Sequence, residues 1–438
     1  MVGLGYVGLS VAAVLAQRGC RVYGIDCRKE IVDRVKAGIC PLREPGMDDL
    51  VRRVVSFGRL TAHCDARVAG EAGIVILAVG TPPDENHRPD KSQLFQALDD
   101  IAPWLKKGQA LFIKSTVPPG VTREVAGYLA EKTGLNPGSD IDVACCPERL
   151  AEGRIIADLW SIPVVVGGLT PENTAGAVSF WAGLGWEVIP VSGPEEAEMA
   201  KLADNLWIDL NIALANELWK VCHRLNINVM EVIAAANTLP KGTGKVNILF
   251  PGPGVGGSCL VKDPWFLHHH GLEKGLALVL PAAGRKVNES MPDFIVEVLG
   301  EGLARRGLGL SGARVAVLGL SFKQETGDTR YSPTVPLIGR LWSAGAALRV
   351  YDPWVEPGHA RELTKGMAAV ESSLAAAVAG CDAVVFMVGH PEFLRGSGYW
   401  REIVGSECLL LDCRNIFDPG EMAGAGLNYV APGRPVLL

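Results

Sequence analysis

The sequence lacks the features that mark membrane, secreted and nucleic-acid-binding proteins. No uninterrupted apolar run reaches the ~18 residues of a membrane-spanning helix. The 11 cysteines are odd in number and form no CxxC pair, and the opening MVGLGYVGLS has neither a basic region nor a cleavage signal, which argues against a secreted disulfide framework. The formal net charge is −6, so no excess of Lys and Arg indicates nucleic acid or an anionic membrane as partner. We therefore expect a cytoplasmic protein with reduced thiols.

The composition and patterning that are present indicate a large α/β protein. The chain has 438 residues, of which 48% are apolar and 21% charged, as in globular proteins of two or three domains. Short Val/Ile/Leu runs alternate with amphipathic segments in both halves, which indicates parallel sheets covered on both faces. Residues 195–227 repeat apolar side chains at helical spacing without a proline, which predicts one long helix. We predict two Rossmann-like, doubly wound parallel-sheet domains, 1–190 and 301–438, joined by this long central helix and a helical domain at 191–300.

A dinucleotide fingerprint stands at the head of the chain. GLGYVG (3–8) matches GxGxxG, opens a helical pattern, and precedes a strand that ends in Asp26. Glycines let the backbone approach a pyrophosphate, and the acidic residue accepts ribose hydroxyls and repels a 2′-phosphate, so NAD is favoured over NADP; Arg28 nearby weakens that preference. Only two residues precede Gly3, so we expect the first strand to be truncated, and an added N-terminal strand to raise stability and NAD affinity.

One cysteine differs from the other ten. FPGPGVGGSCLVKD (250–263) places Cys259 after a glycine- and proline-rich loop, at an expected helix start. A helix N-terminus and the charge of Lys262 would lower the thiol pKa. Asp263, one helical turn on, could orient water or take a proton. We interpret Cys259 as a nucleophile, against the alternative of a structural thiol, and the other cysteines as buried small hydrophobic residues.

Motifs along the whole chain resemble those of the nucleotide-sugar dehydrogenases, the family of UDP-glucose, GDP-mannose and UDP-N-acetylhexosamine 6-dehydrogenases. They are GLGYVGL (3–9), GTPPDENHRPD (80–90), STVPPG (115–120), CPERLAEG (146–153), AEMAKLADN (197–205), FPGPGVGGSCLVKDPWFL (250–267) and GLSFKQETGDTRYSP (319–333). The resemblance implies a four-electron oxidation, in which the alcohol at the sugar's sixth carbon becomes a carboxylate and two NAD are consumed. The nucleotide sugar is then the substrate, and a homodimer built on the long helix is expected, with an apolar stripe at Leu206, Leu210, Ala213 and Leu214.

The resemblance also implies residue roles. Cys259 would form a thiohemiacetal and then a thioester, while Lys201 and Asn205, spaced to share one helix face, would stabilise the oxyanion. Thr116 and Asp263 would orient the catalytic water, and Glu148 would help to position water or the thioester region. Glu152 would contact the sugar or a proton relay, and which carboxylate is the base stays open. The cofactor residues are Gly3, Gly5, Tyr6, Val7, Gly8, Asp26, Arg28, Thr81 and Thr116. The substrate residues are Glu148, Arg149, Leu150, Lys201, Asn205, Gly256, Phe322, Lys323, Arg330 and Arg414.

Several alternatives stay open at this stage. Asp328 and Arg330 could instead form an interdomain ion pair, and His268–His270 are interpreted as structural or surface residues, with no metal expected. For the sugar we favour UDP-N-acetyl-D-mannosamine, then UDP-N-acetylglucosamine. UDP-glucose is the alternative, because the segments GGSC (256–259) and KD (262–263) resemble those of the UDP-glucose branch. A two-electron β-hydroxyacid dehydrogenase shares a Rossmann domain followed by long helices, but it needs neither Cys259 nor a second α/β domain. A non-catalytic sensor would lack the complete set of catalytic residues.

Overall fold

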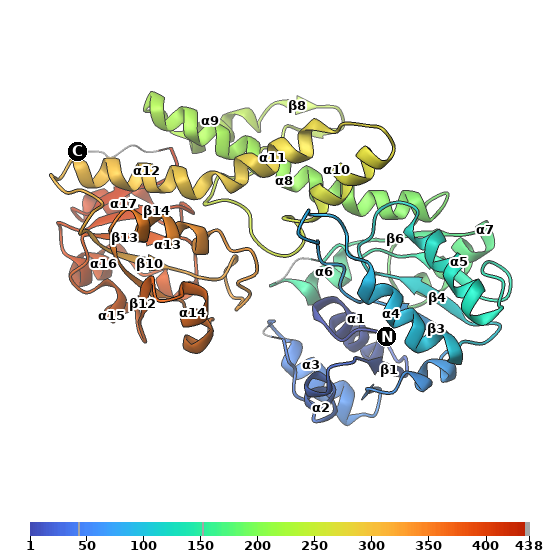
Figure 1. Cartoon of the computed structure of the whole chain (residues 1–438). Helices are drawn as coiled ribbons and strands as arrows, with labels where there is room; N and C mark the ends of the chain where they lie inside the picture. Colours follow the sequence, from blue (N-terminus) through green and yellow to red (C-terminus); the bar gives the residue numbers. More distant parts are fainter. Residues whose placement is uncertain (43, 151–152, 434–438) are drawn as a thin grey trace. The chain divides into compact units, whose positions relative to one another are not determined.

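The computed structural model describes residues 1–42, 44–150 and 153–433 (Figure 1). They form two compact units. The first unit comprises Met1–Asn205 and Trp265–Ala277, and the second comprises Leu206–Pro264 and Leu278–Leu438. In the described part of the chain, no helix combines the length and the apolarity that crossing a membrane requires.

The first unit is built on parallel strands. They are β1 (Val22–Ile25), β2 (Leu60–His63), β3 (Ile74–Leu77), β4 (Ala110–Ile113), β5 (Asp142–Cys145), β6 (Val164–Gly168) and β7 (Val188–Pro190). β1 pairs with β2, and the others follow in the order β3-β4-β5-β6-β7. All pairs are parallel except β5 with β6. Val2 bridges Ile25 and Leu77 in parallel, so residue 2 alone occupies the strand position between β1 and β3.

Helices cover both faces of this sheet because successive strand residues point to opposite sides. Ile76 and Phe112 pack with α1 (Tyr6–Gln17), α2 (Lys29–Lys36), α3 (Met47–Ser56), α6 (Ile155–Ser161) and α7 (Pro171–Gly183). Their neighbours Val75 and Leu111 pack with α4 (Ser92–Ile101), α5 (Val121–Thr133), η1 (Ala66–Glu71) and η2 (Ala102–Trp104). The doubly wound arrangement predicted for this part is confirmed.

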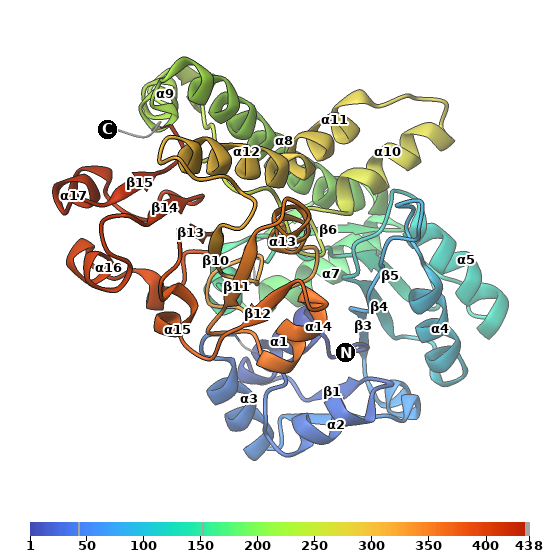
Figure 2. The ribbon, with the colours of Figure 1, turned by 60° about the vertical axis from the view of Figure 1, so that its left-hand side comes forward.

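The second unit contains a fully parallel sheet of six strands in the order β12-β11-β10-β13-β14-β15. They are β10 (Arg314–Leu318), β11 (Ala347–Tyr351), β12 (Ala368–Val370), β13 (Ala383–Phe386), β14 (Leu409–Asp412) and β15 (Asn428–Val430). One face packs on α12 (Met291–Ala304), α13 (Thr334–Ser343) and α14 (Pro357–Thr364). The other packs on η3 (Pro391–Phe393), α15 (Leu374–Val378), α16 (Ser397–Val404) and α17 (Pro419–Gly424) (Figure 2).

The long predicted helix is α8 (Pro194–Leu225), which is 32 residues long. It is followed by α9 (Val229–Ala236), the short strands β8 (Pro240–Lys241) and β9 (Gly244–Lys245), α10 (Asp263–Glu273) and α11 (Val279–Glu289). The boundary between the two units falls inside α8, after Asn205, and inside α10, after Pro264. Both helices therefore contribute residues to each unit.

Two sequence interpretations are wrong in detail. Cys27 and Cys64 are exposed rather than buried, because they follow the last residues of β1 and β2, although all 11 thiols are free. The expected apolar stripe on α8 is also misplaced: Ala213 is buried, and Leu210 packs against Gly284 of α11. The exposed apolar residues of α8 in the second unit are Trp207, Leu214, Val221 and Leu225.

Candidate active site

The glycine-rich turn between Val2 and α1 has the shape of a phosphate-binding loop. Gly3 adopts φ +89, and a Cβ there would lie 2.7 Å from the Ala78 carbonyl oxygen. A Cβ on Gly8 would lie 1.9 Å from the Gly3 carbonyl oxygen, whereas a Cβ on Gly5 would meet nothing within 4 Å. No side chain caps α1, and its first turn contains no acidic residue. Two glycines thus permit close packing, the third leaves open space, and the helix start suits an anionic pyrophosphate.

Asp26 stands at the end of β1, beside this turn. Its Oδ2 accepts a hydrogen bond of 2.8 Å from the backbone N–H of Leu4, and its Oδ1 accepts one of 2.9 Å from the N–H of Arg28. Burial raises the pKa of Asp26, but hydrogen bonds from Arg28 and Leu4 outweigh it, so the pKa lies below its ordinary value. The carboxylate is therefore ionised and placed for ribose hydroxyls. Arg28 Nε lies 3.2 Å from Asp26 Oδ1 and offsets part of its charge.

Two loops meet next to the glycine-rich turn. The Thr81 hydroxyl, after β3, donates a hydrogen bond of 2.7 Å to the carbonyl oxygen of Thr116, after β4. The Ser115 hydroxyl donates one of 2.8 Å to the carbonyl oxygen of Val79. Because both loops follow the carboxyl ends of adjacent parallel strands, the structure brings the predicted Thr81 and Thr116 together at the sheet edge where cofactors bind in this architecture.

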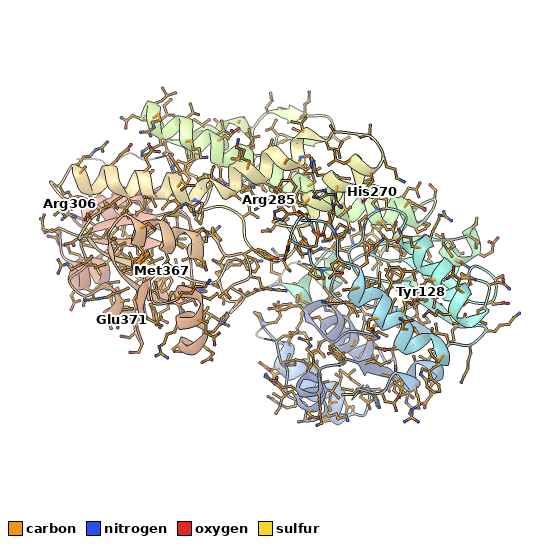
Figure 3. All side chains as sticks on the ribbon, in the orientation of Figure 1. Tyr128, His270, Arg285, Arg306, Met367 and Glu371 are labelled. Carbon is orange, nitrogen blue, oxygen red and sulfur yellow. The ribbon has the colours of Figure 1, made fainter. Side chains whose placement is uncertain are left out.

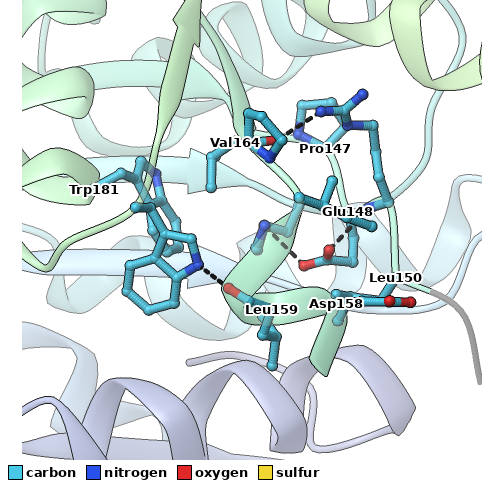
Figure 4. Close-up of a pocket in the computed structure, with 12 residues that line it drawn as sticks. Pro147, Glu148, Leu150, Asp158, Leu159, Val164 and Trp181 are labelled. Carbon is cyan, nitrogen blue, oxygen red and sulfur yellow. Dashed lines mark hydrogen bonds and ion pairs between the residues drawn. The ribbon is translucent and has the colours of Figure 1, made fainter. Parts of the chain in front are cut away.

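Glu148 forms a buried ion pair that sequence reasoning missed. Lys114 Nζ lies 2.9 Å from Glu148 Oε2, and both side chains are buried. Lys114 also donates a hydrogen bond of 3.2 Å to the carbonyl oxygen of Cys146 and lies 4.9 Å from the centre of the Trp181 ring. A small cavity is lined by Lys114, Glu148 and Trp181 together with Leu150, Asp158 and Leu159 (Figure 4). The signal that could have found Lys114 is a lone charge at the end of the apolar run ALFIK.

The neighbouring residues of the CPER segment are held inside the first unit. Arg149 Nη2 donates a hydrogen bond of 2.6 Å to the carbonyl oxygen of Pro163, and its Nη1 lies 3.5 Å from Asp204 Oδ2 on α8. Leu150 packs against the core of the first unit. Glu152 lies outside the described residues.

Lys201 and Asn205 share one face of α8, as their spacing predicts. Both are buried, and Lys201 Nζ donates a hydrogen bond of 3.4 Å to Asn205 Oδ1. An ammonium and an amide fixed side by side on a rigid helix are suited to stabilising a negative oxygen.

Glu198, one turn before Lys201, ties α8 to the loop that carries Thr116. Its Oε2 accepts a hydrogen bond of 2.6 Å from the N–H of Gly120, and its Oε1 accepts bonds of 2.7 and 2.6 Å from the N–H and hydroxyl of Thr122. Burial raises the pKa of Glu198 to about 7, although these hydrogen bonds act against the rise.

We expect the titration of Glu198 to weaken the fold as pH rises. Its pKa is about 7 in the folded chain against an ordinary value of 4.5. The folded state thus holds the proton more tightly, and the associated stability is complete below pH 4.5 and is lost as pH rises through 7. The loss is on the order of 3 kcal/mol in the free energy of unfolding.

Urea unfolding between pH 4.5 and 8 tests this expectation. The stability of the wild type relative to Glu198→Gln should fall across that range, because glutamine does not titrate. The matched control is Glu196→Gln, which removes an exposed carboxylate from the same turn of α8. A stability difference between wild type and Glu198→Gln that stays constant with pH would contradict the assignment.

Cys259 lies on an exposed turn of the second unit. α10 begins at Asp263 rather than at Cys259, so the predicted helix start is wrong by one turn; the Cys259 carbonyl oxygen accepts a hydrogen bond of 2.9 Å from the Asp263 N–H. Lys262 Nζ lies 2.5 Å from Asp263 Oδ1, and both are buried. The charge of Lys262 is therefore paired with Asp263, and this pair anchors the start of α10 directly after the cysteine.

The loop before Cys259 packs on residues of the second α/β domain. A Cβ on Gly256 would lie 2.6 Å from Phe322 Cβ, and one on Gly257 would lie 2.9 Å from the Phe322 ring. Arg414 Nε donates a hydrogen bond of 3.0 Å to the carbonyl oxygen of Met387, and its Nη2 donates one of 3.3 Å to that of Phe322. The predicted residues Gly256, Phe322 and Arg414 thus gather within one unit.

Arg330 forms a local ion pair rather than an interdomain one. Its Nε lies 2.9 Å from Asp328 Oδ2, two residues earlier in the same loop of the second unit. The Gly257 N–H donates a hydrogen bond of 2.9 Å to the Arg330 carbonyl oxygen. The alternative of an interdomain pair is therefore wrong, because both partners belong to one unit. Lys323, in the turn after β10, is partly buried.

Asp352, at the end of β11, occupies the position that Asp26 occupies at the end of β1. Its Oδ2 accepts a hydrogen bond of 2.7 Å from the Leu320 N–H and one of 2.9 Å from the Ser321 N–H. His390 Nε2 lies 3.3 Å from the same oxygen, and both side chains are fully buried. This carboxylate resembles Asp26 in accepting backbone N–H hydrogen bonds, but its side-chain partner is the buried His390, whereas that of Asp26 is the exposed Arg28.

Two of the three consecutive histidines, His268 and His269, pack against the side chain of Trp265. His268 and His269 lie 5.6 and 6.3 Å from the ring of Trp265, which stacks on His87 at 5.2 Å. All four residues belong to the first unit.

The domain models of one protein family match three consecutive parts of the chain. The NAD-binding domain of the UDP-glucose/GDP-mannose dehydrogenase family matches residues 1–183, the central domain of that family residues 195–290, and its UDP-binding domain residues 316–419. The chain belongs to the UDP-glucose/GDP-mannose dehydrogenase family.

The similarity to individual family members extends over nearly the whole chain. A UDP-N-acetyl-D-mannosamine dehydrogenase of Pyrococcus horikoshii is 35% identical, with 95% of each chain covered. A solved structure of a UDP-D-ManNAc dehydrogenase from the same organism has TM-score 0.88 at 33% identity and covers 100% of this chain and 99% of the other. A UDP-glucose dehydrogenase structure from Pyrobaculum islandicum has TM-score 0.86 at 30% identity, with 99% and 96% covered.

Membership confirms the enzyme class and the cofactor predicted from the sequence. The chain is an NAD-dependent nucleotide-sugar dehydrogenase, an oxidoreductase. The open space at Gly5, the uncapped start of α1 and the ionised Asp26 fit the pyrophosphate and a ribose of NAD. Because the second α/β domain matches the UDP-binding domain of this family, the β-hydroxyacid dehydrogenase alternative is set aside.

Proposed function

We propose that the enzyme oxidises UDP-N-acetyl-D-mannosamine to UDP-N-acetyl-D-mannosaminuronate through a covalent bond to Cys259. The observation that carries the substrate is the whole-length similarity to the Pyrococcus horikoshii relative, which is named for that sugar. The observation that supports the covalent step is an exposed cysteine on a glycine-rich loop, directly before the buried pair of Lys262 and Asp263.

In the proposed reaction, the Cys259 thiolate acts after the first oxidation. The Gly3–Gly8 turn would hold NAD, which would supply the hydride acceptor for each of the two oxidations, one NAD molecule for each. The sulfur adds to the aldehyde carbon, the aldehyde oxygen takes up a proton, and a thiohemiacetal forms. Loss of a hydride from that carbon and of the hydroxyl proton turns it into a thioester, and water then releases the carboxylate and the thiol. Lys201 and Asn205 stabilise the oxyanion that forms on the sixth oxygen. Asp263, Thr116 and Glu148 position the hydrolytic water.

The nucleotide is assigned to the second unit. Phe322 packs beside the base, and Lys323 and Arg414 neutralise the phosphates or contact the sugar. Gly256 allows close approach because it lies against Phe322. Arg330 contacts the substrate in this proposal, and Asp328 of the same loop holds its guanidinium in place. Glu148, Arg149 and Leu150 are further substrate residues in this proposal.

UDP-glucose is the alternative substrate. The residues Gly256-Gly257-Ser258 before Cys259, and the pair of Lys262 and Asp263 after it, resemble the UDP-glucose branch of the family, and the Pyrobaculum islandicum relative is named for that sugar. UDP-N-acetylglucosamine comes next after the favoured sugar, since the two differ only at the second carbon.

NADH production with each candidate sugar tests the proposal. We expect UDP-N-acetyl-D-mannosamine to give the highest kcat/KM, and two NADH per sugar consumed, compared with UDP-N-acetylglucosamine, UDP-glucose and GDP-mannose at equal concentrations. A higher kcat/KM with UDP-glucose would replace the favoured substrate by this alternative. One NADH per sugar, with an aldehyde as the final product, would refute the four-electron reaction.

We also propose a cytoplasmic homodimer with domains at 1–190, 191–300 and 301–438. Trp207, Leu214, Val221 and Leu225 are exposed and recur at helical spacing along α8, so they offer an apolar face to a second copy. Sedimentation velocity checks this: Leu214→Glu should shift the wild-type dimer to a monomer, and a monomeric wild type would contradict it.

A further inference from the structure

A buried polar network binds both ends of the loop that carries Cys259. Its members are Asp209 and Asn216 of α8 and Arg285 and Asn288 of α11, all within the second unit and at most 1% exposed. Arg285 lies where α11 runs beside α8 (Figure 3). The sequence patterns did not single out any of the four.

The first end of the loop is bound through Asn216. Its Oδ1 accepts a hydrogen bond of 2.9 Å from the N–H of Gly252. Its Nδ2 donates one of 2.9 Å to Asn288 Oδ1. The start of the loop is thereby connected to α8 directly and to α11 through one side chain.

The far end is bound through Arg285. Its Nη1 donates a hydrogen bond of 2.8 Å to Asp209 Oδ1 and lies 3.5 Å from the carbonyl oxygen of Leu260, the residue after Cys259. Asn288 Nδ2 donates to Asp209 Oδ1 at 2.8 Å and to the Asp209 carbonyl oxygen at 3.0 Å. Asn288 therefore joins the two ends into one network.

A gain in stability does not by itself explain why these four polar side chains are buried. Burying four polar side chains, two of them charged, carries a desolvation cost that apolar side chains of similar size would avoid. Asp209 Oδ2 is buried without a hydrogen-bond partner, so the network is not fully satisfied. Residues 246–257 form no helix or strand, and a loop of this kind needs tertiary bonds to hold one shape.

We propose that Asp209, Asn216, Arg285 and Asn288 are positioning residues that fix loop 251–260 and hold the Cys259 thiol in one place. Their importance for turnover rests on the proposed role of Cys259. Small displacements of a reacting group can lower rates about 10²-fold, which gives the network a catalytic consequence although none of its members touches the thiol.

The test uses the full-length enzyme and the double variant Asp209→Leu/Arg285→Met. Removing both charges together avoids an unpaired buried charge, so the fold is retained, and the melting temperature checks this. Asn216→Ala provides a second, milder variant that removes the hydrogen bonds to Gly252 and to Asn288 and leaves the pair of Asp209 and Arg285 in place. The matched control is His223→Leu, which removes a contact of 2.9 Å between α8 and Glu301 on α12 without touching the loop.

We measure amide hydrogen exchange of residues 252–260 together with kcat and KM. Both network variants should exchange about tenfold faster in this segment and lose about tenfold or more in kcat, with KM changed less than about threefold, while the control leaves both unchanged. Unaltered exchange in the loop, or a kcat equal to that of the control, would overturn the proposal. Amide hydrogen exchange of the loop does not depend on the reaction mechanism. A failure of the covalent mechanism is therefore detected separately, through the Cys259→Ala variant.

Discussion

Replacing Cys259 by alanine will abolish uronate formation by this enzyme while leaving NAD binding intact. Without the sulfur no thioester forms, so the second oxidation and the release of the acid have no covalent route. We expect the rate of acid formation to fall about 10³-fold or more, as when an enzyme loses its nucleophile. Product analysis by mass spectrometry, with NAD affinity measured in parallel, checks both parts of the expectation.

The chain provides its own control for this variant. Cys64 is also exposed but lies in the first unit, after β2. Cys64→Ala should therefore keep the wild-type rate and both NADH per sugar. Uronate production by Cys259→Ala at a rate near that of Cys64→Ala would refute the covalent mechanism.

Replacing Lys201 by methionine will lower kcat by about 10²–10³-fold, the usual effect of removing one group that stabilises an oxyanion. Methionine preserves the unbranched stem, so packing on α8 changes little, but the charge beside Asn205 is lost. Steady-state kinetics with saturating NAD and substrate measure the effect, and circular dichroism verifies the fold.

Lys220 is the matched control for this substitution because it is the other lysine of α8. Its Nζ donates a hydrogen bond of 2.7 Å to the Ser290 hydroxyl in the second unit. Lys220→Met should retain kcat within about threefold. If the two variants lose activity equally, the effect comes from helix stability and the oxyanion role of Lys201 is wrong.

Much of the fold follows from local sequence patterns. Apolar runs such as ALFI and LLLD become buried strands, and the unbroken helical spacing after Glu195 becomes α8. These predictions succeed because strand and helix periodicity is written in neighbouring residues. The start of α10 is predicted one turn too early, since the glycine-rich loop continues as a turn through Lys262 before regular helix begins.

The parts that could not be predicted depend on pairs of residues far apart in the chain. Lys114 meets Glu148, Glu198 meets Thr122, and Asp209 meets Arg285, and each pair forms only after separate elements pack together. No spacing rule connects such positions, because their approach is fixed by tertiary structure. Motifs found candidate residues for the chemistry, whereas the groups that hold those candidates became visible only in three dimensions.

The buried His390 beside Asp352 has an evolutionary consequence. Asp26 and Asp352 each accept backbone N–H hydrogen bonds, but the side-chain partner of Asp26 is the exposed Arg28 and that of Asp352 is the buried His390. Restoring glycines to the turn after β10 would therefore not by itself create a second dinucleotide site. Under the proposed assignment, cofactor preference is set around Asp26 in the first unit and nucleotide recognition around Phe322 and Arg414 in the second, so selection acts on the two halves of the enzyme separately.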